Sequence, residues 1–382
     1  MTATERTGPL DGLRVVDCSG MIGGGFATTQ LADFGADVVM VEHPEQGDPL
    51  REWPPFDDEV SETSLWWKSI GRNKRCVTLD LSSEEGAALL TELIAEADLF
   101  FENFRPGTME GWGLGPDALR EVNEELIYVR VSGYGQTGPR SRLLPPISLA
   151  DLTAAQFAVQ ASLFAIFERD VGRGGSGEGQ VIDVSLYEPL FRLFLGDVEA
   201  YDRNGRVPTR TGNRHPNAAP RNVYATANGY ITLSASSQRI FENVATAIDR
   251  PDLAAAERFA TNDRRVENAK ALDAIVEAWT SERDTETVIR EMEASDAIVG
   301  PVYDMSDIFA DEQYQAREDV VAIEDPELGE LRTAAPVPKF SRTPGEVEHV
   351  GPRHGQHNEE VYLEEIGLDR SEYERLRSEG II

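Results

Sequence analysis

The chain has 382 residues, of which 68 are Asp or Glu and 36 are Lys or Arg, so its formal net charge is −32 at pH 7. This length is sufficient for one large α/β domain and a smaller one. The strong negative charge argues against nucleic acid and anionic membranes as partners. The acidic residues are spread along the chain, and the lysines are Lys68, Lys74, Lys270 and Lys339. We interpret this composition as that of a halophilic protein that stays soluble in concentrated salt; an acidic mesophilic enzyme is the alternative.

Cysteine and histidine usage gives no sign of a metal centre. Cys18 and Cys76 are too few for a disulfide framework or a thiolate metal site, and the five histidines do not have a metal-ligand spacing on one helix. The segment MTATERTGPLDG lacks the basic and apolar regions of a signal peptide, and we see no apolar run that approaches a membrane span. We therefore expect a cytoplasmic protein without a metal or a permanently bound cofactor.

The first half of the chain alternates short β-branched runs with helical patterns. Strands are predicted at 13–16, 37–41, 77–81, 99–102, 127–131 and 180–186, and helices at 83–97 and 152–168. The first of these helices opens with Ser83 followed by glutamates, as a capped helix does. This order is typical of βαβ units and predicts an α/β fold, with a Rossmann-like large domain around a mostly parallel sheet.

The composition changes after about Gly205. Residues 205–220 are rich in Pro, Gly, Asn and Arg and predict a linker, and a hairpin is predicted at 222–235 with its turn at Asn228-Gly229. Helical patterns follow, and a last amphipathic helix is predicted near 370–379. We expect the large domain to comprise residues 1–204 and 306–382, with a smaller α+β domain at 221–305.

A glycine-rich turn, Gly20 to Gly25, lies between the first predicted strand and helix, and Glu42 ends the second strand. This pattern invites a dinucleotide-binding interpretation, but the strand ends near Asp17, and Thr28 stands where a third Gly or Ala is expected. The turn still offers backbone N–H groups at a helix N-terminus, which suit a phosphate or an oxyanion. Glycines that simply make a turn are the alternative.

Two further segments could contact a ligand. Residues 72–75 (RNKR) form the densest basic cluster of this acidic chain and suit a ligand with several phosphates; a solvated loop with local ion pairs is the alternative. Residues 103–107 (NFRPG) follow a predicted strand, at the edge where ligands bind in open α/β sheets; a Pro-Gly turn is the alternative.

Asp151 precedes the long predicted helix in the segment SLADLTAA. By itself this position predicts an N-cap residue. A helix N-terminus also keeps a carboxylate ionised, so that it can act as a nucleophile. No GxSxG motif is present, so a Ser-His-Asp triad is not supported.

Together these segments resemble the family III CoA-transferases along nearly the whole chain. The resemblance is carried by LDGLRVVDCSG, LADFGADVVMVEHPEQGDPLR, GRNKRCVTLDL, ENFRPGTMEGWGL, VSGYGQTGP, GEGQVIDVSLYEP, AIVGPVYDM and HNEEVYLEEIGL, in this order. It implies a Rossmann-like large domain built from both ends of the chain, a small domain between them, and an interlocked homodimer.

The resemblance also implies roles for individual residues. The nucleophilic aspartate of the family falls on Asp151. The CoA-contacting positions fall on residues from four segments: Met21, Ile22, Gly23, His43, Arg72, Lys74, Arg75, Leu79, Asn103, Phe104 and Arg105. An acyl-CoA and a carboxylic acid are the implied substrates, and they exchange CoA through an acyl-aspartyl anhydride and an aspartyl-CoA thioester.

The acyl donor and acceptor are implied less directly. The halophilic composition, taken together with the family, implies succinyl-CoA as donor and mesaconate or a similar dicarboxylate as acceptor. The arginine-rich linker offers cations for the free carboxylate of such an acid, although a solvated or dimer-contact linker is the simpler interpretation.

One departure from the family lies between Arg142 and Leu144, where a further loop of roughly two dozen residues is normal and would be functional or mobile. Here GPRSRL continues directly into LPPISLAD. The loop is either deleted from the protein or missing from this sequence, and an intact mass above 42.1 kDa would indicate the second. A chain without it should keep the fold, and a non-catalytic CoA-binding protein is then an alternative.

Two enzymatic alternatives remain. An acyl-CoA racemase shares the fold but needs a second acid or base near the substrate α-carbon, and the His-Asp-Ile-Asn-Tyr stretch of such enzymes is not seen after Gly133. A NAD-dependent dehydrogenase requires the glycine motif that is malformed here.

Overall fold

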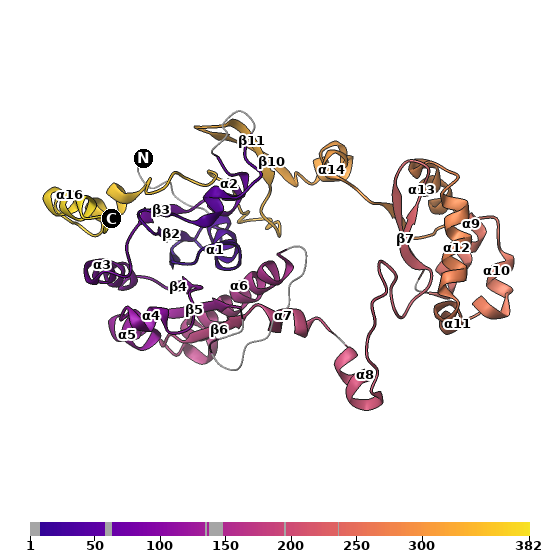
Figure 1. Cartoon of the computed structure of the whole chain (residues 1–382), viewed down its shortest axis with the longest axis horizontal. Helices are drawn as coiled ribbons and strands as arrows, with labels where there is room; N and C mark the ends of the chain where they lie inside the picture. The colour runs from indigo at the N-terminus through magenta and orange to yellow at the C-terminus, as the bar shows by residue number, and fades with distance from the viewer. Residues whose placement is uncertain (1–7, 58–62, 134–135, 137–147, 195, 236) are drawn as a thin grey trace. The chain divides into compact units, whose positions relative to one another are not determined.

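The computed structural model describes residues 8–57, 63–133, 136, 148–194, 196–235 and 237–382 (Figure 1). Contacts divide the chain into two units, one comprising residues 1–195 and 316–382 and the other residues 196–315. Residues 196–204 and 306–315, which were predicted to belong to the large domain, lie in the second of these units. Three helices lie in or overlap these segments, α8 (Asp197–Asn204), α14 (Met305–Ala310) and α15 (Glu312–Ala316), and none of them contains a buried residue.

The large unit is built on a six-stranded sheet with the order β3-β2-β1-β4-β5-β6. Its strands are β1 (Arg14–Asp17), β2 (Asp37–Glu42), β3 (Arg75–Thr78), β4 (Leu99–Glu102), β5 (Ile127–Ser132) and β6 (Val181–Ser185). All five pairings are parallel, which confirms the predicted α/β fold with a mostly parallel sheet. Strand order reverses between β1 and β4, so the carboxyl ends of these two strands flank the crevice where such sheets bind ligands.

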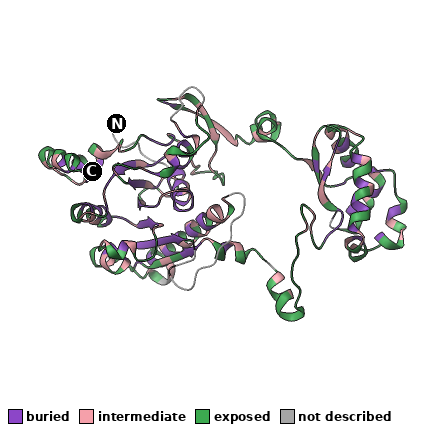
Figure 2. Cartoon of the chain, in the orientation of Figure 1, coloured by how far each residue is buried: buried purple, intermediate pink, exposed green. Residues whose placement is uncertain are grey.

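Helices cover both faces of this sheet (Figure 1). The helical segments of the large unit are α1 (Gly23–Asp33), η1 (Pro49–Glu52), α2 (Leu65–Ile70), α3 (Glu84–Ile94), α4 (Thr108–Gly111), α5 (Pro116–Val122), α6 (Leu149–Asp170), η2 (Gly172–Gly174), α7 (Tyr187–Arg192), η4 (Glu360–Glu365) and α16 (Arg370–Ser378). One core joins the sheet to α1 and α6, and another joins its opposite face to α3, α5, η4 and α16. Of the strands between them, β2, β4 and β5 are almost entirely buried, whereas the edge strand β6 is buried only at its end (Figure 2).

The C-terminal segment returns to the large unit and adds a two-stranded antiparallel sheet, β10 (Val320–Asp325) with β11 (Gly329–Ala334). It docks on the end of β3 through side chains that bind backbone groups. The N–H of Cys76 donates to Nδ1 of His357 at 2.9 Å, and the N–H of Thr78 donates to Oδ1 of Asn358 at 2.8 Å. Both chain ends therefore contribute to one core, as the family resemblance implied.

The second unit contains a three-stranded antiparallel sheet and its own core. Its elements are α8, β7 (Arg221–Ala225), β8 (Tyr230–Ser234), α9 (Gln238–Ala247), α10 (Asp252–Ala255), η3 (Glu257–Phe259), α11 (Asn262–Glu267), α12 (Ala269–Thr280), α13 (Thr285–Glu293), β9 (Val299–Pro301), α14 and α15 (Glu312–Ala316). β7 and β8 form the predicted hairpin around Asn228-Gly229.

Helix α6 corrects one expectation from the sequence. By length and composition alone it could cross a membrane, although no apolar run of that length was expected. Here its small residues Ala154, Ala155 and Ala158 are fully buried in the core that it shares with α1 and the sheet. These alanines let α6 pack closely against α1, but only 28% of its apolar window is buried, and Leu163, Phe164 and Phe167 are exposed.

Candidate active site

The turn between β1 and α1 is held by side chains from two other segments of the sheet edge. Asn103, directly after β4, accepts the N–H of Gly20 at 3.0 Å and donates to its carbonyl at 2.6 Å. Asp48, in the loop after β2, accepts the N–H of Met21 at 3.0 Å. Because these two N–H groups are already paired, the donors that the turn can offer a ligand are those at the start of α1.

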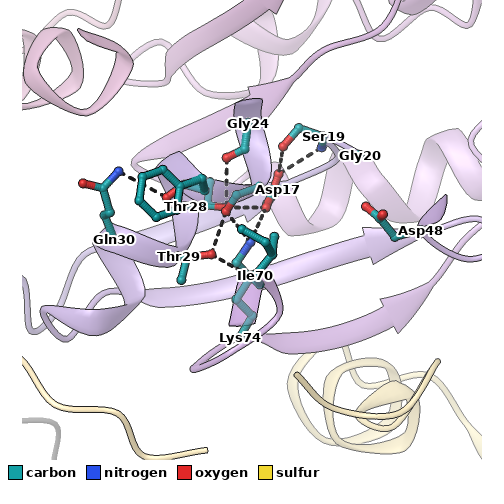
Figure 3. Close-up of polar contacts among 12 residues, drawn as sticks. Asp17, Ser19, Gly20, Gly24, Thr28, Thr29, Gln30, Asp48, Ile70 and Lys74 are labelled. Atoms are coloured by element: carbon teal, nitrogen blue, oxygen red, sulfur yellow. Dashed lines mark hydrogen bonds and ion pairs between the residues drawn. The ribbon is translucent and has the colours of Figure 1, made fainter. Parts of the chain in front are cut away.

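A buried ion pair lies beneath this turn (Figure 3). Asp17 and Lys74 are completely buried, and Nζ of Lys74 lies 3.2 Å from Oδ2 of Asp17 and donates to the carbonyl of Gly25 at 2.8 Å. Asp17 also accepts the N–H and the hydroxyl of Ser19 and, at 2.5 Å, the hydroxyl of Thr28. One carboxylate thus joins the end of β1, the beginning of the turn and the first turns of α1.

Close packing explains two of the three consecutive glycines. A Cβ atom on Gly24 would lie 2.2 Å from Oγ of Ser19, and one on Gly25 would lie 2.9 Å from Cγ2 of Ile70. A Cβ on Gly23 would meet its neighbours only at ordinary contact distances of 3.5 Å or more. Gly23 is thus buried at the start of α1, with Val131, Asp151 and Leu186 as its neighbours, and this helix begins without a side-chain cap.

Asp151, on α6, lies next to Gly23. A Cβ on Gly23 would lie 3.7 Å from Oδ1 of Asp151. Asp151 is the third residue of α6 and Ser148 occupies the N-cap position, so the N-cap interpretation of Asp151 was wrong. The side chain is half-buried, and burial raises the pKa of its carboxyl above the ordinary value. Within the described ranges, no cation and no side-chain donor binds this carboxylate.

The basic segment 72–75 serves the fold instead of presenting free charge. Arg72 is buried and binds Asp33 through two bonds of 3.0 and 2.5 Å, and Lys74 is buried against Asp17. Arg75 pairs with Asp37 at 2.6 Å and with two glutamates near the C-terminus. This arrangement argues against the prediction that these three side chains supply positive charge to CoA phosphates. The three basic residues are close together in the sequence, whereas the carboxylates that bind them belong to distant segments of the chain.

The NFRPG segment lies at the carboxyl end of β4, beside the turn that Asn103 holds. Phe104 is half-buried against Trp112, with ring centroids 5.2 Å apart. Arg105 is exposed, and no carboxylate pairs with it in the part of the chain that the structure describes. Of the predicted contact residues on this segment, Arg105 is thus the one that offers a free cation.

The other predicted contact residues differ in their accessibility. Leu79 and Ile22 are buried in the core, 1% and 3% exposed, so their side chains are not open to a ligand in this structure. Met21 is half-buried at the turn, and His43 is exposed, with its carbonyl 3.0 Å from Nε2 of His354. Backbone atoms of these segments remain at the sheet edge even where their side chains point inward.

Several residues that shape the site were not singled out from the sequence. Glu102 accepts the N–H of Phe104 at 2.7 Å and binds Arg130 at 2.6 Å, which fixes the loop after β4. Burial raises the pKa of Glu102, and Arg130 opposes this rise. Asp48 precedes Pro49, a pattern typical of a helix start, and this signal could have marked it.

The site differs from a dinucleotide-binding site at the residue where such sites bind ribose. The Glu42 carboxylate is buried and is held by Arg51 through two bonds of 2.7 Å, so it is not available to a ribose hydroxyl. Among the described residues there is no group of three or more His, Cys, Asp or Glu side chains that could hold a metal ion.

Comparison with known proteins gives a consistent assignment. The sequence model of CoA-transferase family III matches residues 10–145 and 142–358, two segments that meet where the family loop was expected. The succinyl-CoA–D-citramalate CoA-transferase of Chloroflexus aurantiacus is 36% identical over the whole length of both chains. The succinyl-CoA:mesaconate CoA-transferase of Haloarcula marismortui is 31% identical, over 95% of this chain and 97% of that protein.

Solved structures agree with these matches. A CAIB/BAIF family protein from Brucella suis superposes with a TM-score of 0.81 and 30% identity, covering 94% of this chain and all of that one. Rv3272 from Mycobacterium tuberculosis superposes with a TM-score of 0.78 and 25% identity. The fold, the sequence match and the full-length relatives lead to one conclusion: the chain belongs to CoA-transferase family III.

Proposed function

We propose that this enzyme transfers CoA from succinyl-CoA to a dicarboxylic acid, with Asp151 as the nucleophile. The observation that carries the proposal is the position of the Asp151 carboxylate, half-buried, without a cationic partner among the described residues, and next to the glycine that begins α1. The substrate class is supported by relatives named for succinyl-CoA with D-citramalate, L-malate and mesaconate.

In the proposed first half-reaction, a carboxylate oxygen of Asp151 attacks the thioester carbonyl carbon. The C–S bond breaks, and a mixed anhydride and the CoA thiolate form. The thiolate then attacks the aspartyl carbonyl carbon and expels the donor acid as a carboxylate, which leaves an aspartyl-CoA thioester. No proton is transferred in either step, so the enzyme needs an ionised aspartate and no general base.

In the second half-reaction the acceptor carboxylate attacks the aspartyl carbonyl and releases the thiolate. The thiolate then attacks the acyl carbon of the new anhydride, which forms the product thioester and regenerates Asp151. Negative charge develops on a carbonyl oxygen in every step, and backbone N–H groups at the uncapped start of α1, near Gly23, are placed to donate to it.

We propose that CoA lies along the carboxyl edge of the sheet between the turn and the loop after β4. Arg105 and His43 are exposed and could reach phosphate groups, while Met21, Asn103 and Phe104 border the path toward Asp151. Arg72, Lys74 and Arg75 are left out of this proposal because carboxylates of the same chain already bind them.

We further propose that the enzyme is a homodimer and works in the cytoplasm. Four phenylalanines on α6, on α7 and directly after α7 are between 56% and 64% exposed: Phe164, Phe167, Phe191 and Phe194. Soluble monomers rarely expose so many large apolar side chains in neighbouring helices. Light scattering after size-exclusion chromatography should therefore give twice the chain mass of 42.1 kDa; a monomeric mass would contradict the proposal.

The function is tested by following CoA esters chromatographically with succinyl-CoA as donor. D-citramalate, L-malate, mesaconate and glutarate serve as acceptors in parallel. At least one should be converted to its CoA ester by the wild type and none by Asp151→Asn, while Asp170→Asn, at the exposed other end of α6, keeps its activity. CoA binding without transfer by the wild type would favour the non-catalytic alternative, which the apparent lack of the family loop makes relevant.

A further inference from the structure

Met21 adopts a backbone conformation that is unusual for its residue type. Its φ angle is +64°, in the left-handed region, which non-glycine residues visit at an energetic cost. The structure shows what holds it there: Oδ2 of Asp48 accepts the N–H of Met21 at 3.0 Å. Asp48 is 3% exposed, so this hydrogen bond is shielded from water.

Asp48 is itself fixed on both sides. Its Oδ1 accepts the N–H of Leu50 at 2.7 Å, where Asp48 is the N-cap of η1. Its own N–H donates to Oε1 of Glu42 at 2.9 Å, and Glu42 is held by the guanidinium of Arg51. The Asp48 carboxylate, which accepts the N–H of Met21, is therefore fixed relative to Glu42 at the end of β2.

The same chain of contacts extends to the C-terminal segment. The guanidinium of Arg51 lies 3.8 Å from the ring centroid of Trp67 and donates to the carbonyl of Pro352 at 3.1 Å. The indole N–H of Trp67 donates to that same carbonyl at 2.8 Å. Asp48 is thus connected through Glu42 and Arg51 to the C-terminal segment at Pro352.

From this geometry we infer that Asp48 is a positioning residue of the transfer reaction. Only Ile22 separates Met21 from Gly23, the first residue of α1, which faces the Asp151 carboxylate. The φ angle of Met21 sets the direction in which the first N–H groups of α1 point. Because its hydrogen bond stabilises this φ angle of Met21, Asp48 orients the first N–H groups of α1 toward the carbonyl oxygen on which negative charge develops. The inference rests on the proposed function.

Replacement of Asp48 separates this role from a general one in folding. In Asp48→Asn one carboxylate oxygen becomes an NH₂ group, which faces a backbone N–H and cannot accept from it. In Asp48→Ser the hydroxyl can still cap η1 but is too short to reach Met21 as well. Both variants should lower kcat by about tenfold or more and change KM for the CoA ester by less than about threefold, since the donors act mainly in the transition state.

A matched control is Asp325→Asn. Asp325 is 6% exposed and also accepts two backbone N–H groups, those of Glu327 and Leu328, but it lies in the β10–β11 hairpin. Its replacement should lower the melting temperature and leave kcat within about twofold. Equal kcat losses in the Asp48 and Asp325 variants would overturn the inference, because they would trace the effect to stability alone.

A double-variant cycle tests whether Asp48 acts through Met21. Glycine adopts positive φ without strain, so Met21→Gly should depend less on the hydrogen bond that holds this angle. We expect the fold-loss of kcat that Asp48→Ser causes to be smaller in the Met21→Gly background than in the wild type, by a factor of at least about three. Independent, multiplicative effects would overturn the inference. An active wild type with a fully active Asp48→Ser would also overturn it, whereas an inactive wild type would count against the proposed function.

Discussion

The assignment of Lys74 to the fold and not to CoA gives a sharp prediction for Lys74→Met. Lys74 and Asp17 are both completely buried, and the substitution removes the ion pair of 3.2 Å and the bond of 2.8 Å to the carbonyl of Gly25. Loss of one member of a buried pair costs about 3–5 kcal/mol, because the other charge stays buried without compensation. Asp17 keeps its donors from Ser19 and Thr28, which favours the lower half of this range.

The assay is thermal unfolding together with steady-state kinetics. A loss of this size should lower the melting temperature by about 10 °C, given the usual scaling for a domain of this size. The KM of the remaining folded enzyme for its CoA ester should change by less than about threefold. Lys339→Met is the matched control, since Lys339 is 38% exposed and 3.9 Å from Asp319, and such a pair contributes about 0–1 kcal/mol. A stable Lys74→Met enzyme with a strongly raised KM would refute the structural assignment and restore the sequence-based one.

Three further predictions concern the site, pH and salt. Gly23→Ala should stay active, because a Cβ there meets only ordinary contacts. Gly23→Val should force a branched side chain against Val131 and Asp151 and lower kcat by about a hundredfold, more than a loss of stability of about 1–3 kcal/mol from overpacking explains. An inactive but folded Ala variant would contradict this. Burial lowers the pKa of His357 from 6.5 to about 4, so below about pH 6.5 the native state binds fewer protons than the unfolded state. The free energy of unfolding should therefore fall by about 2 kcal/mol between about pH 7 and about pH 5. Chemical unfolding at the two pH values measures this difference, and His357→Asn should remove it. The net charge of −32 predicts a melting temperature that rises from dilute buffer to molar potassium chloride; a salt-independent value would refute the halophilic interpretation.

Most of the fold could be predicted from the sequence because its signals are local. The β-branched runs gave β4 with its observed bounds and β1, β2 and β5 within one residue, and Ser83 caps α3 as predicted. The start of β3 is two residues earlier than predicted, since Arg75 pairs with β2 although its side chain is charged. Strand order was not predictable from these runs, because it depends on which strands pair across long sequence separations.

The site was predicted less completely, and the reason is electrostatic. The cations of the 72–75 segment are adjacent in sequence, but Asp33 and Asp37 bind Arg72 and Arg75 from segments that precede them by nearly forty residues. Lys74 shows the same difficulty with Asp17. A charge cluster read from sequence alone appears free, and only the tertiary structure shows which charges are already paired. Asp151 was identified through the family resemblance, and its place beside Gly23 emerged from the packing of α6 against α1.

The central claim is that Asp151 becomes covalently attached during transfer. The most direct measurement is mass spectrometry of peptides from enzyme incubated with succinyl-CoA and then treated with hydroxylamine, which cleaves an aspartyl thioester and leaves a hydroxamate. The account predicts a mass increase of about 15 Da on Asp151 in the wild type, and none in Asp151→Asn or without succinyl-CoA. A hydroxamate on another carboxylate, or an enzyme that transfers CoA while Asp151 stays unmodified, would contradict it.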